Sequence, residues 1–206
     1  MITIKWFFAR LKRFILRNPQ AEAGERFEKT VEAGLNKIVE QNKHFWFRRY
    51  YDFRILAMIN RSRGTHLPVP RMVADYEAVY QGQFYTIECK TAKQPRYSIA
   101  WVKEHQVETG LKLEKAGAIY WILICQRIEP IKTERLYALT PQQWLHLIKI
   151  TKLEDYTNIS LKQRAYLNKR QKGYKSISWE NIRKHSIELF KMDGVWDLTP
   201  LFKGMN

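Results

Sequence analysis

The chain has 206 residues, of which 45% are hydrophobic and 14% aromatic, so it can bury a core, and disorder of the whole chain is excluded. Lysine and arginine outnumber acidic residues by 36 to 20, and the net charge of +16 indicates a polyanionic partner such as nucleic acid or an anionic membrane surface. Two cysteines, Cys89 and Cys125, are too few for a disulfide framework or a cysteine-based zinc site, and no apolar stretch approaches the ~18 residues of a membrane span, so we expect a cytoplasmic protein.

The positive charge is densest at the two ends of the chain. Residues 1–20 carry five basic and no acidic groups, residues 21–140 carry 19 against 14, and residues 141–206 carry 12 against 6. This distribution predicts an enzyme core at 20–140 between two extensions that bind nucleic acid. We expect the N-terminal extension, 1–19, to be a basic amphipathic helix and the C-terminal one, 141–206, to be basic and mainly helical.

The N-terminal extension alternates basic side chains with apolar ones near helical spacing, which predicts a helix that ends at Asn18-Pro19. Arg10, Lys12 and Arg13 interrupt any apolar signal-peptide core, so secretion is not expected. Three roles stay open for this helix: packing on the core or on a second subunit, contacting DNA, or lying on a membrane surface.

A second helix is predicted over 21–41, where apolar residues recur at spacings of four, four and three, at Phe27, Val31, Leu35 and Ile38. Aromatic and β-branched residues then predict a strand within 44–59. A loop at 60–70 follows, rich in proline and made basic by Arg61 and Arg63.

Two strand-like segments, 72–80 and 84–90, are separated by Gln81-Gly82-Gln83, a pattern typical of a hairpin turn. If the loop has two residues, Gln81 and Gly82, paired positions sum to 163 and Asp75 faces Glu88. Directly opposed residues have Cβ atoms ~4.5 to 5.5 Å apart, close enough for two carboxylates to share one cation. Lys90 follows Glu88 by two residues, so both point to the same face of the sheet.

The rest of the chain predicts further helices and strands in alternation. A helix at 99–116 should stop at Gly117 and lead into a buried strand at 118–125. Thr140-Pro141 has the residue types of a helix start. Further elements are expected as a strand at 135–139, a helix at 142–150, a strongly basic segment at 160–175 and a last helix at 179–190. The order describes an α/β domain.

Opposed carboxylates in a sheet repel unless a cation lies between them. Mg²⁺ favours oxygen ligands and is typically held by one or two carboxylates together with phosphate oxygens. The ammonium group of Lys90 would orient the attacking water and stabilise charge on the phosphate. The ordinary alternative is that Asp75 ends a strand while Glu88 and Lys90 form an exposed pair, and a one-residue slip in register would separate the carboxylates.

Four motifs in order resemble the PD-(D/E)xK nuclease superfamily, in the branch of the Holliday junction resolvases of archaea, phages and the RecU type. They are residues 24–28 (Gly-Glu-Arg-Phe-Glu), 73–75 (Val-Ala-Asp), 86–91 (Thr-Ile-Glu-Cys-Lys-Thr) and 103–106 (Lys-Glu-His-Gln). The resemblance covers about residues 20–126. The superfamily's proline before the aspartate is replaced here by Ala74, a position that varies among members.

The resemblance implies a restriction-endonuclease-like core, a central mixed sheet flanked by helices in the order αβββαβ, with basic helical extensions. It implies that Glu28, Asp75 and Glu88 bind Mg²⁺, for which Mn²⁺ would substitute. Lys90 would position the water, and Gln106 would support the site or the substrate, so the catalytic set is Asp75, Glu88, Lys90 and Gln106. Two neighbouring glutamates of the same helix, Glu25 and Glu32, are alternatives to Glu28.

By this resemblance the protein is a structure-specific endonuclease that cuts four-way DNA junctions as a symmetric homodimer. Basic side chains near the site would grip DNA phosphates, namely Arg61, Arg63, Arg71, Lys93 and Arg96. One alternative is a restriction-type or repair endonuclease of the same superfamily that acts on duplex or single-stranded DNA. The other is a non-catalytic protein that binds DNA or a membrane surface, in which the carboxylates are incidental.

Overall fold

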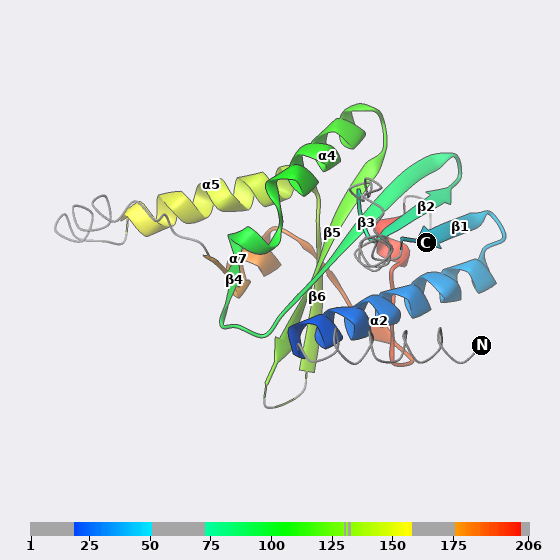
Figure 1. Cartoon of the computed structure of the whole chain (residues 1–206), viewed down its shortest axis with the longest axis horizontal. Coiled ribbons are helices and arrows are strands. Elements are labelled where there is room, and N and C mark those ends of the chain that lie inside the picture. The colour runs from blue at the N-terminus through cyan, green and yellow to red at the C-terminus, as the bar shows by residue number, and fades with distance from the viewer. Residues whose placement is uncertain (1–18, 51–72, 130, 132, 158–175, 203–206) are drawn as a thin grey trace, which may run out of the picture.

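The computed structural model describes residues 19–50, 73–129, 131, 133–157 and 176–202. Their centre is a six-stranded mixed sheet with helices on both faces (Figure 1). The expected N-terminal helix, the 60–70 loop and the basic 160–175 segment lie outside the described residues. No helix within the described ranges is long and apolar enough to cross a membrane.

The strand order in the sheet is β1-β2-β3-β5-β6-β8. β3 and β5 pair in parallel, and every other neighbouring pair is antiparallel. The bounds are β1 Phe45–Arg49, β2 Tyr76–Tyr80, β3 Gln83–Ala92, β5 Ile119–Ile128, β6 Thr133–Leu139 and β8 Ile187–Leu189. The predicted α/β class with a central mixed sheet is confirmed.

The helices of the described ranges are α2 Pro19–Gln41, α4 Glu104–Lys115, α5 Pro141–Thr157 and α7 Trp179–Lys184, with short 3₁₀ turns η1 Ile99–Trp101 and η2 Thr199–Leu201. Two small sheets lie outside the central one. They pair β4 Arg96–Ser98 with β7 Ser176–Ser178, and β9 Lys191–Met192 with β10 Val195–Trp196.

α2 covers one face of the sheet through the predicted apolar stripe, whose four members are at most 5% exposed. Burying each such side chain contributes ~1.5 to 3 kcal/mol. α4 and α5 pack on the opposite face through Val107, Trp144 and Leu147, so the sheet separates α2 from α4 and α5 (Figure 1). Side chains that alternate along β3 therefore face α2 and α4 in turn.

The hairpin has the register that the sequence predicts. Its pairs run from Tyr80 opposite Gln83 to Tyr76 opposite Ile87, so paired numbers sum to 163. Gln81 and Gly82 both have positive φ, 49° and 76°, as a type I′ turn requires. Glycine adopts this conformation without strain, which explains why two residues suffice to close the turn.

The helix predicted at 99–116 is divided in two. η1 ends at Trp101, and α4 begins only at Glu104. The side chain of Gln106 accepts a hydrogen bond from the Lys103 backbone N–H at 2.9 Å, which caps the new start. Gly117, with φ of 89°, ends the helix before β5, as expected.

The last helix predicted at 179–190 is wrong beyond Lys184. The chain turns there and forms β8, which pairs with the outer edge of β6. Pairing with β8 satisfies the backbone N–H and C=O groups on the outer edge of β6, which a surface helix would leave unpaired. The C-terminal segment also adds Trp196, Leu198 and Phe202 to the core beneath α2, so these residues of the expected extension belong to the main core.

Candidate active site

Asp75 lies where the regular β2–β3 ladder ends. Its backbone N–H donates to the Ile87 carbonyl at 3.0 Å, and its carboxylate Oδ2 accepts a hydrogen bond from the Cys89 amide at 2.6 Å. On the other side, the Tyr50 amide donates to the Asp75 carbonyl at 2.8 Å. Backbone contacts with two neighbouring strands therefore fix both the main chain and the carboxylate of Asp75.

Glu88 is a buried carboxylate, only 4% exposed, in the middle of β3. Burial and, to a lesser extent, the neighbouring Asp75 carboxylate raise its pKa to about 7, although Lys90 and Gln106 lower it in part. The two carboxylates are therefore close enough to repel each other. A buried acid of this kind is stabilised in its charged form only where cations and hydrogen-bond donors surround it.

Lys90 lies on the same face as Glu88, as its spacing predicts, and its Nζ contacts Glu88 Oε1. Burial alone would lower the pKa of this ammonium group, but the charge and hydrogen bond of Glu88 outweigh burial and raise it. Lys90 is therefore a charged cation at neutral pH. This environment does not favour an uncharged Lys90 that acts as a base.

Gln106 reaches the same carboxylate from α4. Its Nε2 donates to Glu88 Oε1 at 2.5 Å, while its Oε1 accepts the Lys103 amide. The parallel crossover from β3 to β5 brings α4 over this face of the sheet. The structure thus brings together four of the expected residues: Asp75, Glu88, Lys90 and Gln106.

Glu28 is on α2, on the other side of the sheet from Gln106. It forms an ion pair with Arg49 of β1 at 2.7 Å, and Glu32 binds the same guanidinium group at 2.7 Å. Among the described residues no group of three Asp, Glu, His or Cys side chains lies close enough to hold a metal ion. The third metal ligand expected at Glu28 therefore stays a prediction, and in this structure its carboxylate is bound to Arg49.

The residues present nevertheless fit a hard divalent cation. The charges of Asp75 and Glu88 repel each other, and a cation held between them would relieve this repulsion. Mg²⁺ is commonly held by one or two carboxylates together with waters and phosphate oxygens, so two carboxylates suffice.

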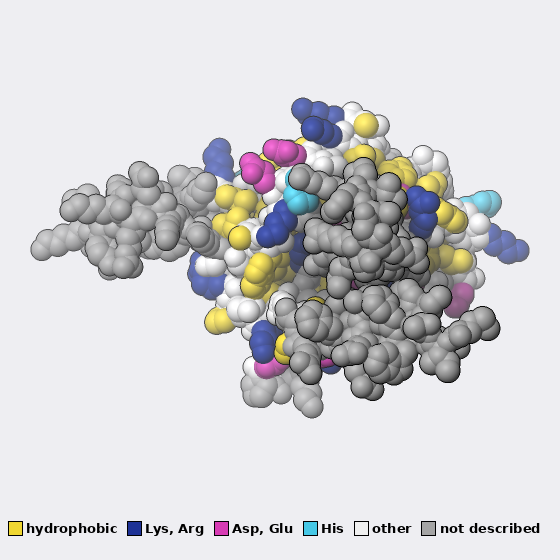
Figure 2. All heavy atoms as spheres, in the orientation of Figure 1, with side chains coloured by type: hydrophobic (Ala, Val, Ile, Leu, Met, Phe, Trp, Pro, Cys, Tyr) yellow, Lys and Arg dark blue, Asp and Glu magenta, His cyan; other side chains and the backbone are white. Residues whose placement is uncertain are grey.

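Two of the expected DNA-binding residues are described, and both are exposed. Lys93 follows β3 directly, and Arg96 on β4 donates to the Ser176 hydroxyl at 3.1 Å and to its carbonyl at 3.0 Å. Arg61, Arg63 and Arg71 lie outside the described residues. Figure 2 shows Lys and Arg side chains in several separate places around one face of the molecule.

Sequence reasoning missed a second buried carboxylate near the site, Glu77 of β2, which is 9% exposed. Arg48 forms an ion pair with it at 2.6 Å, and the Tyr50 hydroxyl also contacts it. Glu77 lies opposite Thr86 of β3, so it points to the same face as Glu88 and Lys90. The period of two could have flagged Glu77, but its partners come from a strand whose register the sequence alone did not give.

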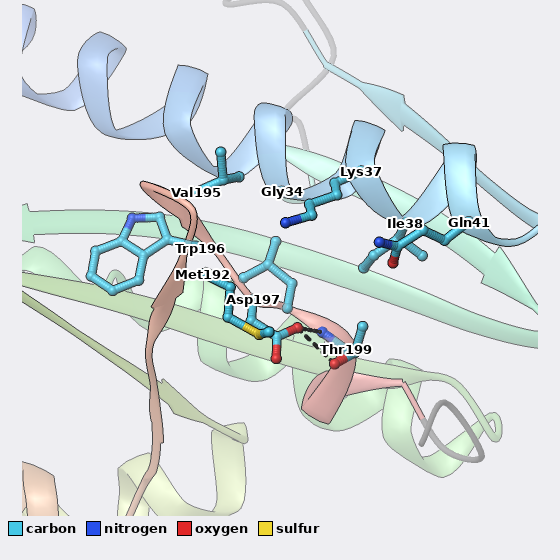
Figure 3. A pocket seen from close by; sticks show the side chains of 10 residues that line it. Gly34, Lys37, Ile38, Gln41, Met192, Val195, Trp196, Asp197 and Thr199 are labelled. Carbon is cyan, nitrogen blue, oxygen red and sulfur yellow. Dashed lines mark hydrogen bonds between the residues drawn. The ribbon is translucent and has the colours of Figure 1, made fainter.

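A cavity of about 280 Å³ lies on the other side of the sheet, between α2 and the C-terminal β9–β10 hairpin (Figure 3). Gly34 lines it, and a Cβ there would come within 2.6 Å of the Trp196 carbonyl, so only glycine permits this close approach. None of the expected site residues lines this cavity. It is therefore separate from the carboxylate cluster.

A hairpin that carries an aspartate and a Glu-x-Lys motif on one face, with a helix glutamine bound to the glutamate, defines a PD-(D/E)xK nuclease. A profile of the family Recombination protein U (RecU) matches residues 22–199, most of the chain. The chain therefore belongs to the Recombination protein U family and is an endonuclease of the Holliday junction resolvase type. The expected resemblance is confirmed, and it extends well beyond residue 126.

One solved structure similar to this chain is Hjc of Archaeoglobus fulgidus, a Holliday junction resolvase from an archaeal hyperthermophile. The two share 15% sequence identity with a TM-score of 0.40, over 80% of this chain and 95% of the Hjc chain. Among curated proteins, none matches this chain.

Proposed function

We propose that this protein resolves four-way DNA junctions by Mg²⁺-assisted phosphodiester hydrolysis at Asp75, Glu88 and Lys90. The observation that carries the proposal is the meeting of these residues with Gln106 on one face of the sheet. Two carboxylates, one of them deeply buried, lie beside a charged lysine. This is the combination that binding a cation and a phosphate together requires.

In this proposal Asp75 and Glu88 hold the metal ion through their carboxylate oxygens. Bound there, Mg²⁺ would supply Lewis acidity and lower the pKa of a coordinated water. The ammonium group of Lys90 orients the attacking water and stabilises negative charge that develops on the phosphate. Because Lys90 is charged, it acts through its field and its hydrogen bonds rather than as the base.

Gln106 and Glu28 have supporting roles in the proposal. Gln106 fixes the orientation of the Glu88 carboxylate through its 2.5 Å hydrogen bond. Glu28 joins the metal site if its ion pair with Arg49 opens when DNA and metal bind. Mn²⁺ would replace Mg²⁺, since both prefer oxygen ligands.

The proposed assembly is a homodimer, because two nicks on opposed strands resolve a junction and a twofold axis places two sites symmetrically. Arg61, Arg63, Arg71, Lys93 and Arg96 are proposed to contact phosphates, so affinity should fall steeply with salt. We place the enzyme in the cytoplasm, where the two free, buried thiols Cys89 and Cys125 would stay reduced.

The decisive experiment compares cleavage of a four-way junction, a sequence-matched linear duplex and a single strand, with Mg²⁺ and with EDTA. We expect the junction to be cut in Mg²⁺ only. Equal cutting of junction and duplex would reject junction resolution in favour of a duplex nuclease of the same superfamily. Cutting in EDTA would reject the metal-dependent mechanism.

A further inference from the structure

β1 is the outer strand of the sheet, next to β2, which begins directly after Asp75. Its side chains alternate between two environments. Phe45 and Phe47 pack into the core on the α2 side, and Arg49 binds the two α2 glutamates. Trp46 and Arg48 must therefore point to the other face.

That other face is the one that carries the catalytic cluster. Arg48 pairs with Glu77 across the strands, and their side chains are joined by an ion pair at 2.6 Å. Glu77 lies opposite Thr86, which shares its face of β3 with Glu88 and Lys90. Trp46 and Arg48 thus extend the catalytic face outward to the edge of the sheet.

Trp46 is exposed in a way that its residue type rarely is. It is 49% exposed, and it is the only tryptophan among the large exposed hydrophobic side chains of the described residues. An exposed aromatic side chain beside a basic one offers a surface on which a nucleobase can stack. Arg48 beside it has 57% of its side chain exposed, although contacts with Glu77 and the Tyr50 hydroxyl hold its guanidinium group in place.

We propose that Trp46 stacks on a nucleobase at the branch point of the junction, with Arg48 on the adjoining phosphate, and that this contact favours junction over duplex. The inference rests on the proposed function, because it takes DNA as the substrate. Trp46 lies on β1, four residues before Tyr50, whose amide donates to the Asp75 carbonyl. Trp46 is therefore ~13 Å along the strand from the residue that holds Asp75. This distance equals about four base steps of DNA at ~3.4 Å each.

The chemistry of the partner follows from these two side chains. Aromatic rings bind nucleobases by stacking, and the face of a base is available where neighbouring base pairs separate. Within a linear duplex both faces of each base are covered by its neighbours. A branch point, where the arms separate, uncovers them, so Trp46 would distinguish the two DNA forms without reading sequence.

The test measures affinity without cleavage, in EDTA, by fluorescence anisotropy of a labelled four-way junction and of a matched linear duplex. Trp46→Ala should weaken junction binding about tenfold and duplex binding less than about twofold. Trp46→Phe should recover most of the loss, because phenylalanine also stacks. Phe190→Ala is the matched control, since Phe190 is 67% exposed and borders the opposite edge strand, β8.

Two results would overturn the inference. One is a Trp46→Ala protein that binds both DNAs as the Phe190→Ala control does. The other is a Trp46→Ala protein that is monomeric in light scattering while the wild type is a dimer, which would make Trp46 a contact between two copies of the chain. Because the assay needs no cleavage, failure of the inference leaves junction cleavage by the wild type intact, while failure of the proposed function shows in the cleavage comparison. Thermal unfolding of each variant confirms that it is folded.

Discussion

The Cys89 amide donates a hydrogen bond to the Asp75 carboxylate at 2.6 Å, and this bond holds the Asp75 side chain against β3. The regular pairing of β2 with β3 ends at Tyr76 and Ile87, one residue short of Asp75. The side chain of Asp75 takes the place of a backbone acceptor and is held beside Glu88. The orientation of the Asp75 carboxylate is therefore set by the backbone of the strand that carries Glu88.

Asp75→Asn should reduce junction cleavage by at least about 100-fold, because it removes a carboxylate from the proposed metal site. Stability should not fall, since the change also removes a like charge beside Glu88. Single-turnover cleavage and thermal unfolding measure the two effects. The control is Asp193→Asn, whose side chain is 89% exposed and binds Lys37 on the other side of the sheet. Cleavage by the Asp75 variant at the control's rate would disprove the site.

The stability of the metal-free protein should depend on pH through Glu88. Its pKa is about 7 in the folded chain against an ordinary value of 4.5. Between these values the folded chain holds a proton that the unfolded chain has lost, so the free energy of unfolding decreases as pH rises through this window and is level above it.

Over that window the wild type should lose about 2 to 3 kcal/mol relative to Glu88→Gln, which cannot titrate at this position. Urea denaturation of both proteins at pH 5 and pH 8, without divalent ions, measures the difference. Parallel pH dependences in the two proteins would mean that folding does not raise the pKa of Glu88.

Lys90→Met should shift the pH dependence of cleavage upward as well as lower the rate by about 100-fold. The ammonium group favours the charged form of Glu88, so its loss raises the pKa of Glu88 above its present value of about 7. Metal binding requires the deprotonated carboxylate, and more alkaline pH should then be needed. Rates measured from pH 6 to pH 9 test this, with Lys90→Arg keeping the charge. An unchanged pH midpoint would contradict the pairing.

Glu28 and Glu32 form a matched pair for testing the third metal ligand, since both bind Arg49 at 2.7 Å. Each change to glutamine removes one of these ion pairs. If Glu28 joins the metal site, Glu28→Gln should weaken Mn²⁺ affinity about tenfold or more in calorimetry, while Glu32→Gln leaves it unchanged. Equal effects of the two changes would limit Glu28 to a structural role.

Gln106→Ala should lower the free energy of unfolding by about 1 to 2 kcal/mol and also weaken cleavage. The residue caps α4 and holds Glu88 at once. Gln143 makes the same cap at the start of α5, accepting the Thr140 amide at 2.8 Å, without touching the site. Gln143→Ala should therefore lose similar stability and keep full activity. Loss of activity in both variants would show that the lower activity follows from the lower stability and not from the contact with Glu88.

The amino-acid sequence by itself determined the local parts of this protein. The apolar stripe of α2 and the two-residue turn at Gln81 and Gly82 follow from helical spacing and from glycine's conformational freedom. The turn sets the register, and the period of two then places Glu88 and Lys90 on one face. Each of these features depends on residues close together along the chain.

Tertiary structure alone decided what depends on distant partners. The crossover that lays α4 over β3 brings Gln106 to Glu88, and β1 supplies the arginine that binds Glu28. The C-terminal segment became a strand because an open sheet edge lay within its reach, which no local propensity encodes. Asp75, Glu88 and Lys90 were visible as a motif, but the raised pKa of Glu88 comes from burial and from the held charge of Asp75, and both arise only when the strands and helices pack.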